Sequence, residues 1–309
     1  MIVSPSYKTD IPAFYGDWFI NRLKAGYCRM VNPYNRNQNS RVSLRRDDVD
    51  GFVFWTKNIG PFLDKLAEVH AKGYPFIIQY TINCYPRKLE FSVTDATRAV
   101  KHAAEIARQY GSRTLVWRYD PVVFSSEAPV ESHLENFEWL ASRLEGITDE
   151  VVISFAQIYQ KTRRNMDWAS REFGFAWTDP DDQQKRSLMR ELLRIARARR
   201  MQLTLCSQPY LLESGVQEAH CVDARRISSL LGREIQSRLK GPRKECGCFE
   251  SKDIGDYDTC PHGCVYCYTV QNRTLAQKRY REHDPESEFL WGGRLAVPSE
   301  TATDAPLLF

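Results

Sequence analysis

Short apolar runs alternate with segments of helical periodicity along most of the chain. The runs predict strands at residues 2–3, 51–56, 76–81, 115–119, 151–155 and 202–206. Between them, helical patterns fall at residues 17–24, 61–71, 94–110, 130–144 and 182–199, and a last helix is expected at 221–239. Near-continuous apolar strands separated by helices are typical of a parallel sheet covered on both faces. We therefore expect an α/β fold, in which six repeats favour a partial (βα)6-type parallel barrel over an open doubly wound sheet.

Turn and cap residues agree with this division into elements. Thr94 is suited to cap the helix at 94–110, and Gly111 is suited to end it. Residues 28–44 carry many Asn and Arg, and they predict either a hairpin or an irregular excursion. We expect three regions: the barrel at 1–240, a cysteine-rich segment at 241–283 and a C-terminal strap or tail at 284–309.

Composition restricts the class of protein. The 309 residues are 42% hydrophobic and 27% charged, which is typical of a globular chain, and no run approaches the length of a membrane span. The first residues lack a basic segment followed by an apolar run, so we expect no secretion signal and a cytoplasmic location. Nine unevenly spaced cysteines do not suggest a disulfide framework. In a reducing compartment, clustered thiols bind metals instead.

Several common enzyme classes are disfavoured by missing motifs. No Gly-x-Gly-x-x-Gly follows a predicted strand, and no Gly-Lys-Ser/Thr phosphate loop occurs. A Gly-x-Ser-x-Gly nucleophile elbow is also absent from the sequence. A nicotinamide dehydrogenase, a P-loop nucleotidase and a serine hydrolase are therefore not expected.

The sharpest chemical signal is the run Cys260-Pro-His-Gly-Cys264-Val-Tyr-Cys267-Tyr268. Three thiolates can hold an iron–sulfur cluster and leave one iron open to a substrate or cofactor. Zinc is the competing interpretation, because Cys264 and Cys267 form a C-x2-C hook that Cys246, Cys248 and Cys260 could complete. His262, between Pro and Gly, is expected to be a loop-packing residue.

These residues carry a resemblance. The C-x3-C-x2-C spacing with Tyr266 before the third cysteine resembles the cluster loop of the radical S-adenosylmethionine superfamily, and the full run is most similar to spore photoproduct lyase-like (DNA repair photolyase) proteins. In that superfamily the loop normally follows the first barrel strand, whereas here it follows the last repeat. The whole chain, including Ser251-x-Asp253-Ile-Gly-x-Tyr257-Asp258-Thr259, resembles an uncharacterised family with a C-terminal cluster of this kind.

The resemblance implies a [4Fe–4S] cluster on Cys260, Cys264 and Cys267, with S-adenosylmethionine on the open iron and Tyr266 and Tyr268 flanking them. It also implies a one-electron reductant such as flavodoxin or ferredoxin, and a 5′-deoxyadenosyl radical as the reactive species. The cluster segment would fold over the barrel mouth, where barrel sites are built. Nearness to the photoproduct lyase-like group implies nucleic-acid repair or modification.

Polar residues at the predicted strand ends are candidates for holding the cofactor. Lys57 or Arg118 could meet its carboxylate, and Asn58, Asp120 or Gln208 its ribose or amine. The ordinary interpretation of each residue is that it is a polar residue at the start of a loop or a helix cap. Arg118 and Asp120 stand out, because a charged pair at the end of a buried strand is costly unless the charges are paired or used.

Cys246 and Cys248 leave two interpretations open. Either thiol could close the fourth iron, in which case the protein is a non-catalytic four-thiolate iron–sulfur or zinc protein acting in binding or electron transfer. Alternatively, the two thiols are free and near the barrel mouth, where either could act catalytically by donating a hydrogen atom or resolving a thiyl radical.

A second open question is the Arg stripe at 186, 190, 194 and 197, with Trp168 and Trp177 nearby. It is either a solvated helix face or a nucleic-acid contact.

Overall fold

The computed structural model of the chain describes residues 1–32, 35–241, 243 and 245–293. Its centre is a sheet of eight strands in the order β11-β10-β8-β6-β5-β4-β1-β12, in which all neighbours are parallel. The strands are β1 (Ile2–Ser4), β4 (Gly51–Thr56), β5 (Phe76–Thr81), β6 (Leu115–Val122), β8 (Glu150–Phe155), β10 (Gln202–Leu205), β11 (Gln217–Glu218) and β12 (Ser251–Asp253). The predicted α/β class with a parallel sheet is therefore confirmed. Among the described strands, no ladder joins the two edges, β11 and β12.

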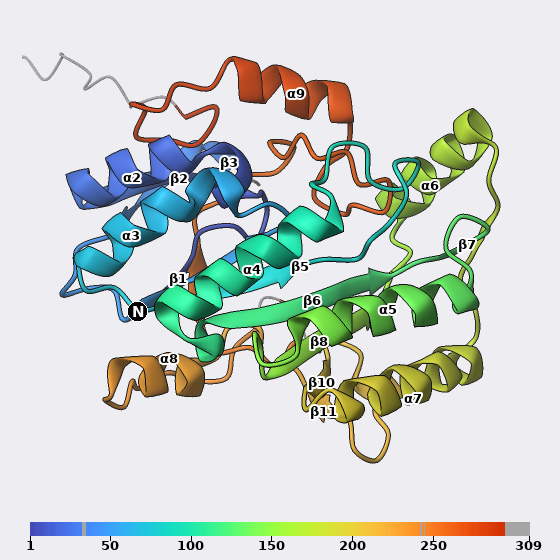
Figure 1. Cartoon of the computed structure of the whole chain (residues 1–309). Helices are drawn as coiled ribbons and strands as arrows, with labels where there is room; N and C mark the ends of the chain where they lie inside the picture. The colour runs from blue at the N-terminus through green and yellow to red at the C-terminus, as the bar shows by residue number, and fades with distance from the viewer. Residues whose placement is uncertain (33–34, 242, 244, 294–309) are drawn as a thin grey trace, which may run out of the picture.

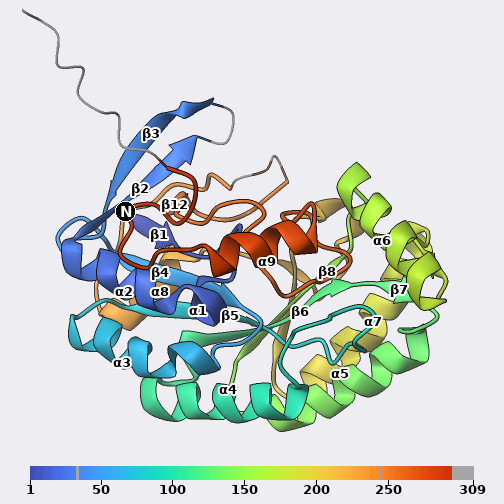
Figure 2. The same cartoon turned by 90° about the horizontal axis from the view of Figure 1, so that it is seen from above.

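Helices cover one face of this sheet, where Figure 2 shows α2, α3, α4, α5 and α7 in a row. The helices are α1 (Ile11–Phe14), α2 (Gly16–Ala25), α3 (Leu63–Ala71), α4 (Ala96–Tyr110), α5 (Val130–Leu144), α6 (Gln160–Phe173), α7 (Asp182–Ala198), α8 (Ala224–Leu231) and α9 (Arg273–Arg281). In Figure 1, α8 and α9 lie on opposite sides of the molecule. Among the described residues, none of these helices has the length and apolar character that a bilayer crossing requires.

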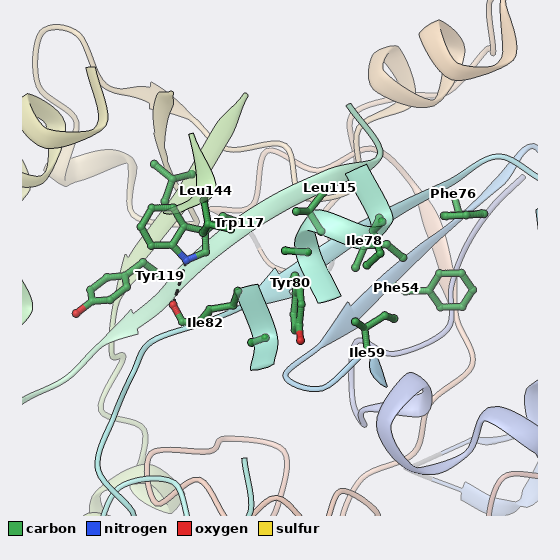
Figure 3. Close-up of a cluster of buried hydrophobic side chains, with 14 of the residues drawn as sticks. Phe54, Ile59, Phe76, Ile78, Tyr80, Ile82, Leu115, Trp117, Tyr119 and Leu144 are labelled. Carbon is green, nitrogen blue, oxygen red and sulfur yellow. Dashed lines mark hydrogen bonds between the residues drawn. The ribbon is translucent and has the colours of Figure 1, made fainter. Parts of the chain in front are cut away.

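Alternate residues of each strand face opposite sides of the sheet, as strand geometry requires. On β6, Trp117 and Tyr119 pack among the helices, and Figure 3 shows Trp117 donating to the backbone oxygen of Ile82 at 3.0 Å. Val116, one residue before Trp117, belongs to a second apolar cluster on the opposite face. Arg118 is two residues after Val116 and so lies on the same face. The charged end of β6 therefore points away from the helices.

Several predicted boundaries differ from the structure. Asp95, not Thr94, caps α4, since its carboxylate accepts the N–H of Arg98 at 2.9 Å. The helix expected at 221–239 is only α8, because Gly232 takes a left-handed conformation at φ +67° and ends it. The sequence patterns did not predict α6 or α9.

Two small pairs of strands lie outside the main sheet. Residues 28–44 form the hairpin alternative, with β2 (Tyr27–Asn32) antiparallel to β3 (Asn35–Ser43). A second antiparallel pair joins β7 (Phe124–Ser125) to β9 (Trp177–Thr178).

The C-terminal region is bound into the fold at two places. β12, from the cysteine-rich segment, pairs with β1 and so forms an edge of the main sheet. Further on, the indole of Trp18 donates to the backbone oxygen of Ser287 at 2.9 Å, and Arg29 pairs with Glu288 at 2.6 Å. Residues 284–293 therefore act as a strap over α2 and the hairpin, while 294–309 of the expected tail lie outside the described residues.

Candidate metal and cofactor site

The cysteine loop is anchored beside the segment that follows β5. Cys264 forms an isolated antiparallel bridge with Glu90, and the N–H of Val265 donates to the oxygen of Leu89 at 3.1 Å. At the other end of the loop, the N–H of Ser92 donates to the oxygen of His262 at 2.9 Å. These backbone bonds fix the loop at the carboxyl ends of the sheet strands, where open α/β sheets and barrels build their sites.

Asp10 connects this loop to the N-terminal part of the chain. One carboxylate oxygen accepts the N–H of Ala13 and caps α1, while the other accepts the N–H of Lys57 at 2.7 Å. The same oxygen lies 2.7 Å from Nε2 of His262, whose ring packs edge-on against Phe14. His262 is thus a packing residue, as expected, and also one end of a buried hydrogen bond that the sequence did not reveal.

Lys57, Glu90 and Tyr266 form a buried polar network beneath the loop. The ammonium of Lys57 lies 2.7 Å from Glu90 and donates to the phenol oxygen of Tyr266 at 3.0 Å, and that phenol also bonds Glu90. Burial by itself lowers the pKa of Lys57, but the charge and hydrogen bond of Glu90, together with Cys264 and Asp120, outweigh it and the net pKa is raised. Burial, followed by the charge of Glu90, raises the pKa of Tyr266 well above its usual range. The network holds a cation next to Cys264.

Arg118 and Asp120 satisfy each other's charge at the end of β6. Their closest atoms lie 2.8 Å apart, and Ser154 donates a further hydrogen bond to Asp120. Burial by itself raises the pKa of Asp120, yet Arg118 and then Ser154 bring the net pKa below its usual value. Arg118 also donates to the thiol of Cys221 at 2.8 Å. The costly charged pair expected from the sequence is therefore internally compensated.

A cavity of about 440 Å³ opens between the loop and the strand ends. That volume is within the range of roughly 300–1,000 Å³ found for small-molecule and cofactor sites. Among the predicted site residues, its walls include Lys57, Arg118, Asp120, Gln208, Tyr266, Cys246, Cys248, Cys260, Cys264 and Cys267. The structure thus brings together nearly all the residues that the sequence singled out.

Two of the predicted cofactor-binding residues have structural partners. Asn58 does not line the cavity; its carboxamide accepts the N–H of Gly60 at 3.2 Å and shapes the turn before α3. Gln208 lines the cavity, but its carboxamide is bonded to both backbone groups of Phe155, at 2.8 and 3.2 Å. The ordinary capping role accounts for Asn58, and Gln208 holds the end of β8.

The lining fits a bound polar group. Ser4 and Thr9 line the cavity, and their buried hydroxyl oxygens have no hydrogen-bond partner in the described part of the chain. Buried polar atoms are normally satisfied, so such atoms suggest a ligand or bound water. Burial raises the pKa of the Cys260 and Cys264 thiols.

The described residues contain no group of three or more His, Cys, Asp or Glu side chains already arranged around a single metal ion. A cubane cluster places iron and sulfide between its thiolate ligands. Its fit therefore depends on three thiols that share a space, and Cys260, Cys264 and Cys267 all line the same cavity.

Sequence reasoning missed Asp10, Glu90, Cys206 and Cys221. Glu90 lies in a loop without any pattern that marks it. Cys206 and Cys221 each follow a strand of the main sheet, β10 and β11, and both line the cavity. The convergence of parallel strands at their carboxyl ends was the signal that could have found these two thiols.

The arginine stripe of α7 has ordinary partners on the protein. Arg190 pairs with Glu213 and Arg194 with Glu191, each at 3.1 Å, while Arg186 and Arg197 donate to backbone oxygens of Tyr210 and Gly215. The indole of Trp177 donates to Asp167, and Trp168 is exposed. These contacts favour the solvated-face interpretation.

Fold and site together define an α/β protein with a thiol-rich cavity at the carboxyl ends of a parallel sheet. The chain belongs to the family described as Domain of unknown function (DUF1848), whose model matches residues 2–269. Membership of an uncharacterised family is therefore confirmed. No curated protein and no solved structure matches the chain.

Proposed function

We propose that this protein is a radical S-adenosylmethionine enzyme. The observation that carries the proposal is that the three thiols of the C-x3-C-x2-C loop line one cavity with the charged ends of β4 and β6. An open-iron cluster needs three thiolates, room for a cofactor and nearby polar groups, and this cavity offers all three. Ser4 and Thr9 add hydroxyls that lack partners within the described residues.

The finer fold that accompanies this function is a partial barrel. In support, the second apolar cluster gathers one residue from each of five sheet strands: Ile2, Val53, Ile77, Val116 and Val152. Residues from so many parallel strands share one cluster most readily when the sheet curves around them. The cavity then corresponds to the mouth of the barrel, over which the cluster segment folds.

In this proposal Cys260, Cys264 and Cys267 hold a [4Fe–4S] cluster, and the chain's other residues position its surroundings. When bound and reduced by one electron, the cluster and S-adenosylmethionine supply a 5′-deoxyadenosyl radical for hydrogen abstraction. Lys57, kept protonated by Glu90, offers a cation for a carboxylate near Cys264. Tyr266 is held in place by hydrogen bonds to Lys57 and Glu90.

The substrate and partners follow only from the resemblance of the loop. By analogy with the photoproduct lyase-like group, we propose nucleic-acid repair or modification as the reaction class. A flavodoxin or ferredoxin would supply the electron, and the reducing cytoplasm suits the free thiols.

A second candidate function is a non-catalytic thiolate metal protein acting in binding or electron transfer. Cys246 and Cys248 favour it, since they line the same cavity as the loop. The two candidates differ in whether an iron remains open for S-adenosylmethionine.

The test is anaerobic reconstitution with iron and sulfide, followed by dithionite and S-adenosylmethionine. We expect the wild type to produce 5′-deoxyadenosine and Cys264→Ala to lose both iron and product. Cys84→Ala is the matched control, because Cys84 is exposed and lies outside the cavity lining, and it should behave as the wild type. Full iron loading without 5′-deoxyadenosine, or no iron that depends on Cys264, would overturn the proposal.

A further inference from the structure

Four cysteines outside the loop form a second group of thiols on the cavity wall. Sγ of Cys221 lies 3.5 Å from Sγ of Cys206, and the thiol of Cys221 also contacts that of Cys248. Cys248 in turn contacts Cys246, so the order of contact is Cys206, Cys221, Cys248, Cys246. Three of the four are buried and Cys246 is half-buried. None of these contacts involves the loop cysteines.

Several hydrogen-bond donors around this group could stabilise thiolates. Cys248 accepts the N–H of Val222 at 3.4 Å, and Cys246 accepts the N–H of Cys248. The guanidinium of Arg118 donates to Cys221 at 2.8 Å and is itself buried. Backbone N–H groups and a buried cation stabilise negative sulfur, whereas neutral thiols packed as small hydrophobes require neither.

The backbone around the group is closely fitted. A Cβ on Gly241 would meet the oxygen of Cys246 at 2.4 Å and its Cβ at 2.5 Å, so only glycine allows this approach. Ser207, directly after Cys206, is a buried non-glycine residue at φ +55°. Such strained conformations persist where the surroundings hold them, frequently at functional sites.

We propose that Cys206, Cys221, Cys246 and Cys248 bind a single zinc-class metal ion with four thiolate ligands. A zinc–sulfur bond is about 2.3 Å, which places the sulfurs of a tetrahedral site about 3.8 Å apart. The 3.5 Å between Cys206 and Cys221 agrees with that spacing. A cubane would instead hold its ligands apart on separate irons, so a single ion fits this group better than a second cluster.

Closing the site requires small side-chain movements. The thiols stand as a chain of contacts, and the described residues contain no group of three ligands already arranged around an ion. Cys246 is the least buried of the four, and a rotamer change there would bring its thiol toward that of Cys206. Binding releases one proton from each thiol and leaves a doubly negative centre, which Arg118 partly neutralises.

The position of the ion indicates its purpose. Cys206 follows β10, Cys221 follows β11, and Cys246 with Cys248 precede β12. β11 and β12 are the two edges of the main sheet, between which no ladder occurs in the described residues. The ion would tie these edges together and fix the segment that carries the cysteine loop. This role does not depend on the radical chemistry proposed above.

The test is the metal content of the full chain purified anaerobically from zinc-supplemented cells. We expect one equivalent of zinc per chain in the wild type and at least a tenfold loss in the Cys221→Ala, Cys248→Ala double variant. Cys264→Ala is the matched control: it should lose iron and keep its zinc. Cobalt substitution of the wild type should give thiolate-to-cobalt charge-transfer bands and tetrahedral d–d bands.

A titration of the wild type keeps the proposal falsifiable if the double variant fails to fold. When a mercurial reagent is added stepwise, the zinc released should rise in proportion to the modification of four thiols. Mass spectrometry identifies the cysteines that are modified. The proposal would be overturned by less than a tenth of an equivalent of zinc in the wild type, or by a zinc content that the double variant leaves unchanged. A disulfide between Cys206 and Cys221, or iron and sulfide bound at these four thiols, would also overturn it. Zinc and iron are counted separately, so failure here is distinguishable from failure of the enzyme proposal.

Discussion

Replacing Glu90 by Gln removes one charge from beneath the cysteine loop and changes little else. The side chains of Lys57 and Glu90 are 15% and 4% exposed, and their closest atoms are 2.7 Å apart. Glutamine keeps an oxygen that can accept from Tyr266, so the variant isolates the charge. An uncompensated buried ammonium destabilises a protein by about 3–5 kcal/mol, and we expect Glu90→Gln to fall in that range.

The matched control is a surface pair of the same type. Arg194 and Glu191 have side chains 71% and 50% exposed, and pairs of this kind contribute at most about 1 kcal/mol. Glu191→Gln should therefore change the free energy of unfolding by less than 1 kcal/mol. Adding Lys57→Met to Glu90→Gln removes the stranded cation, so the double variant should be more stable than Glu90→Gln alone.

Urea unfolding monitored by circular dichroism measures the wild type and all three variants, and iron per chain after reconstitution gives a second result. Because the carboxylate of Glu90 bonds Lys57 and Tyr266 beneath the cysteine loop, we expect Glu90→Gln to loosen that loop and to bind less iron than the wild type. Equal unfolding free energies for Glu90→Gln and Glu191→Gln would refute the reasoning. So would a double variant less stable than Glu90→Gln.

Two other predictions concern backbone and protonation. Gly263→Ala should destabilise the protein more than Gly146→Ala: both glycines have φ near +75°, but a Cβ on Gly263 would meet Arg273 at 2.7 Å, whereas Gly146 has nothing within 4 Å. Gly146→Ala should cost about 1–2 kcal/mol in urea unfolding, and an equal cost for Gly263→Ala would contradict the contact. Burial lowers the pKa of His133 to about 4. As the pH falls, the histidine of the unfolded chain takes up a proton before His133 of the folded chain does. The stability due to neutral His133 is therefore present above pH 6.5 and is lost as the pH falls toward 4, by roughly 3 kcal/mol in total. In His133→Gln, the free energy of unfolding should depend less steeply on pH in that window. A slope equal to that of the wild type would contradict this assignment.

The sequence predicted the long elements of the fold well because their patterns are long enough to be specific. The runs of β4, β5 and β6 are mostly apolar and buried, and α4, α5 and α7 carry clear helical periodicity. The edge strands β11 and β12 have only two and three residues, too few for any period to register. The cap at Asp95 was assigned one residue too early, since Thr94 and Asp95 are both good capping residues.

The candidate site was predictable where chemistry is local and unpredictable where it depends on folding. The spacing of Cys260, Cys264 and Cys267 is written in the sequence, and the strand-end positions of Lys57 and Arg118 followed from the strand pattern. Glu90 enters the site through a loop. Cys221 meets both Cys206 and Cys248 only once the chain has folded. No spacing in the sequence records such contacts between distant residues.

The central claim is that the cysteine loop holds a cluster with an open iron. The most direct test is the electron paramagnetic resonance spectrum of the reconstituted, dithionite-reduced wild type, recorded with and without S-adenosylmethionine. The account predicts the signal of a reduced [4Fe–4S] cluster that changes shape when S-adenosylmethionine is added and is missing from Cys264→Ala. A cluster signal that S-adenosylmethionine leaves unchanged, or one that persists in Cys264→Ala, would contradict it.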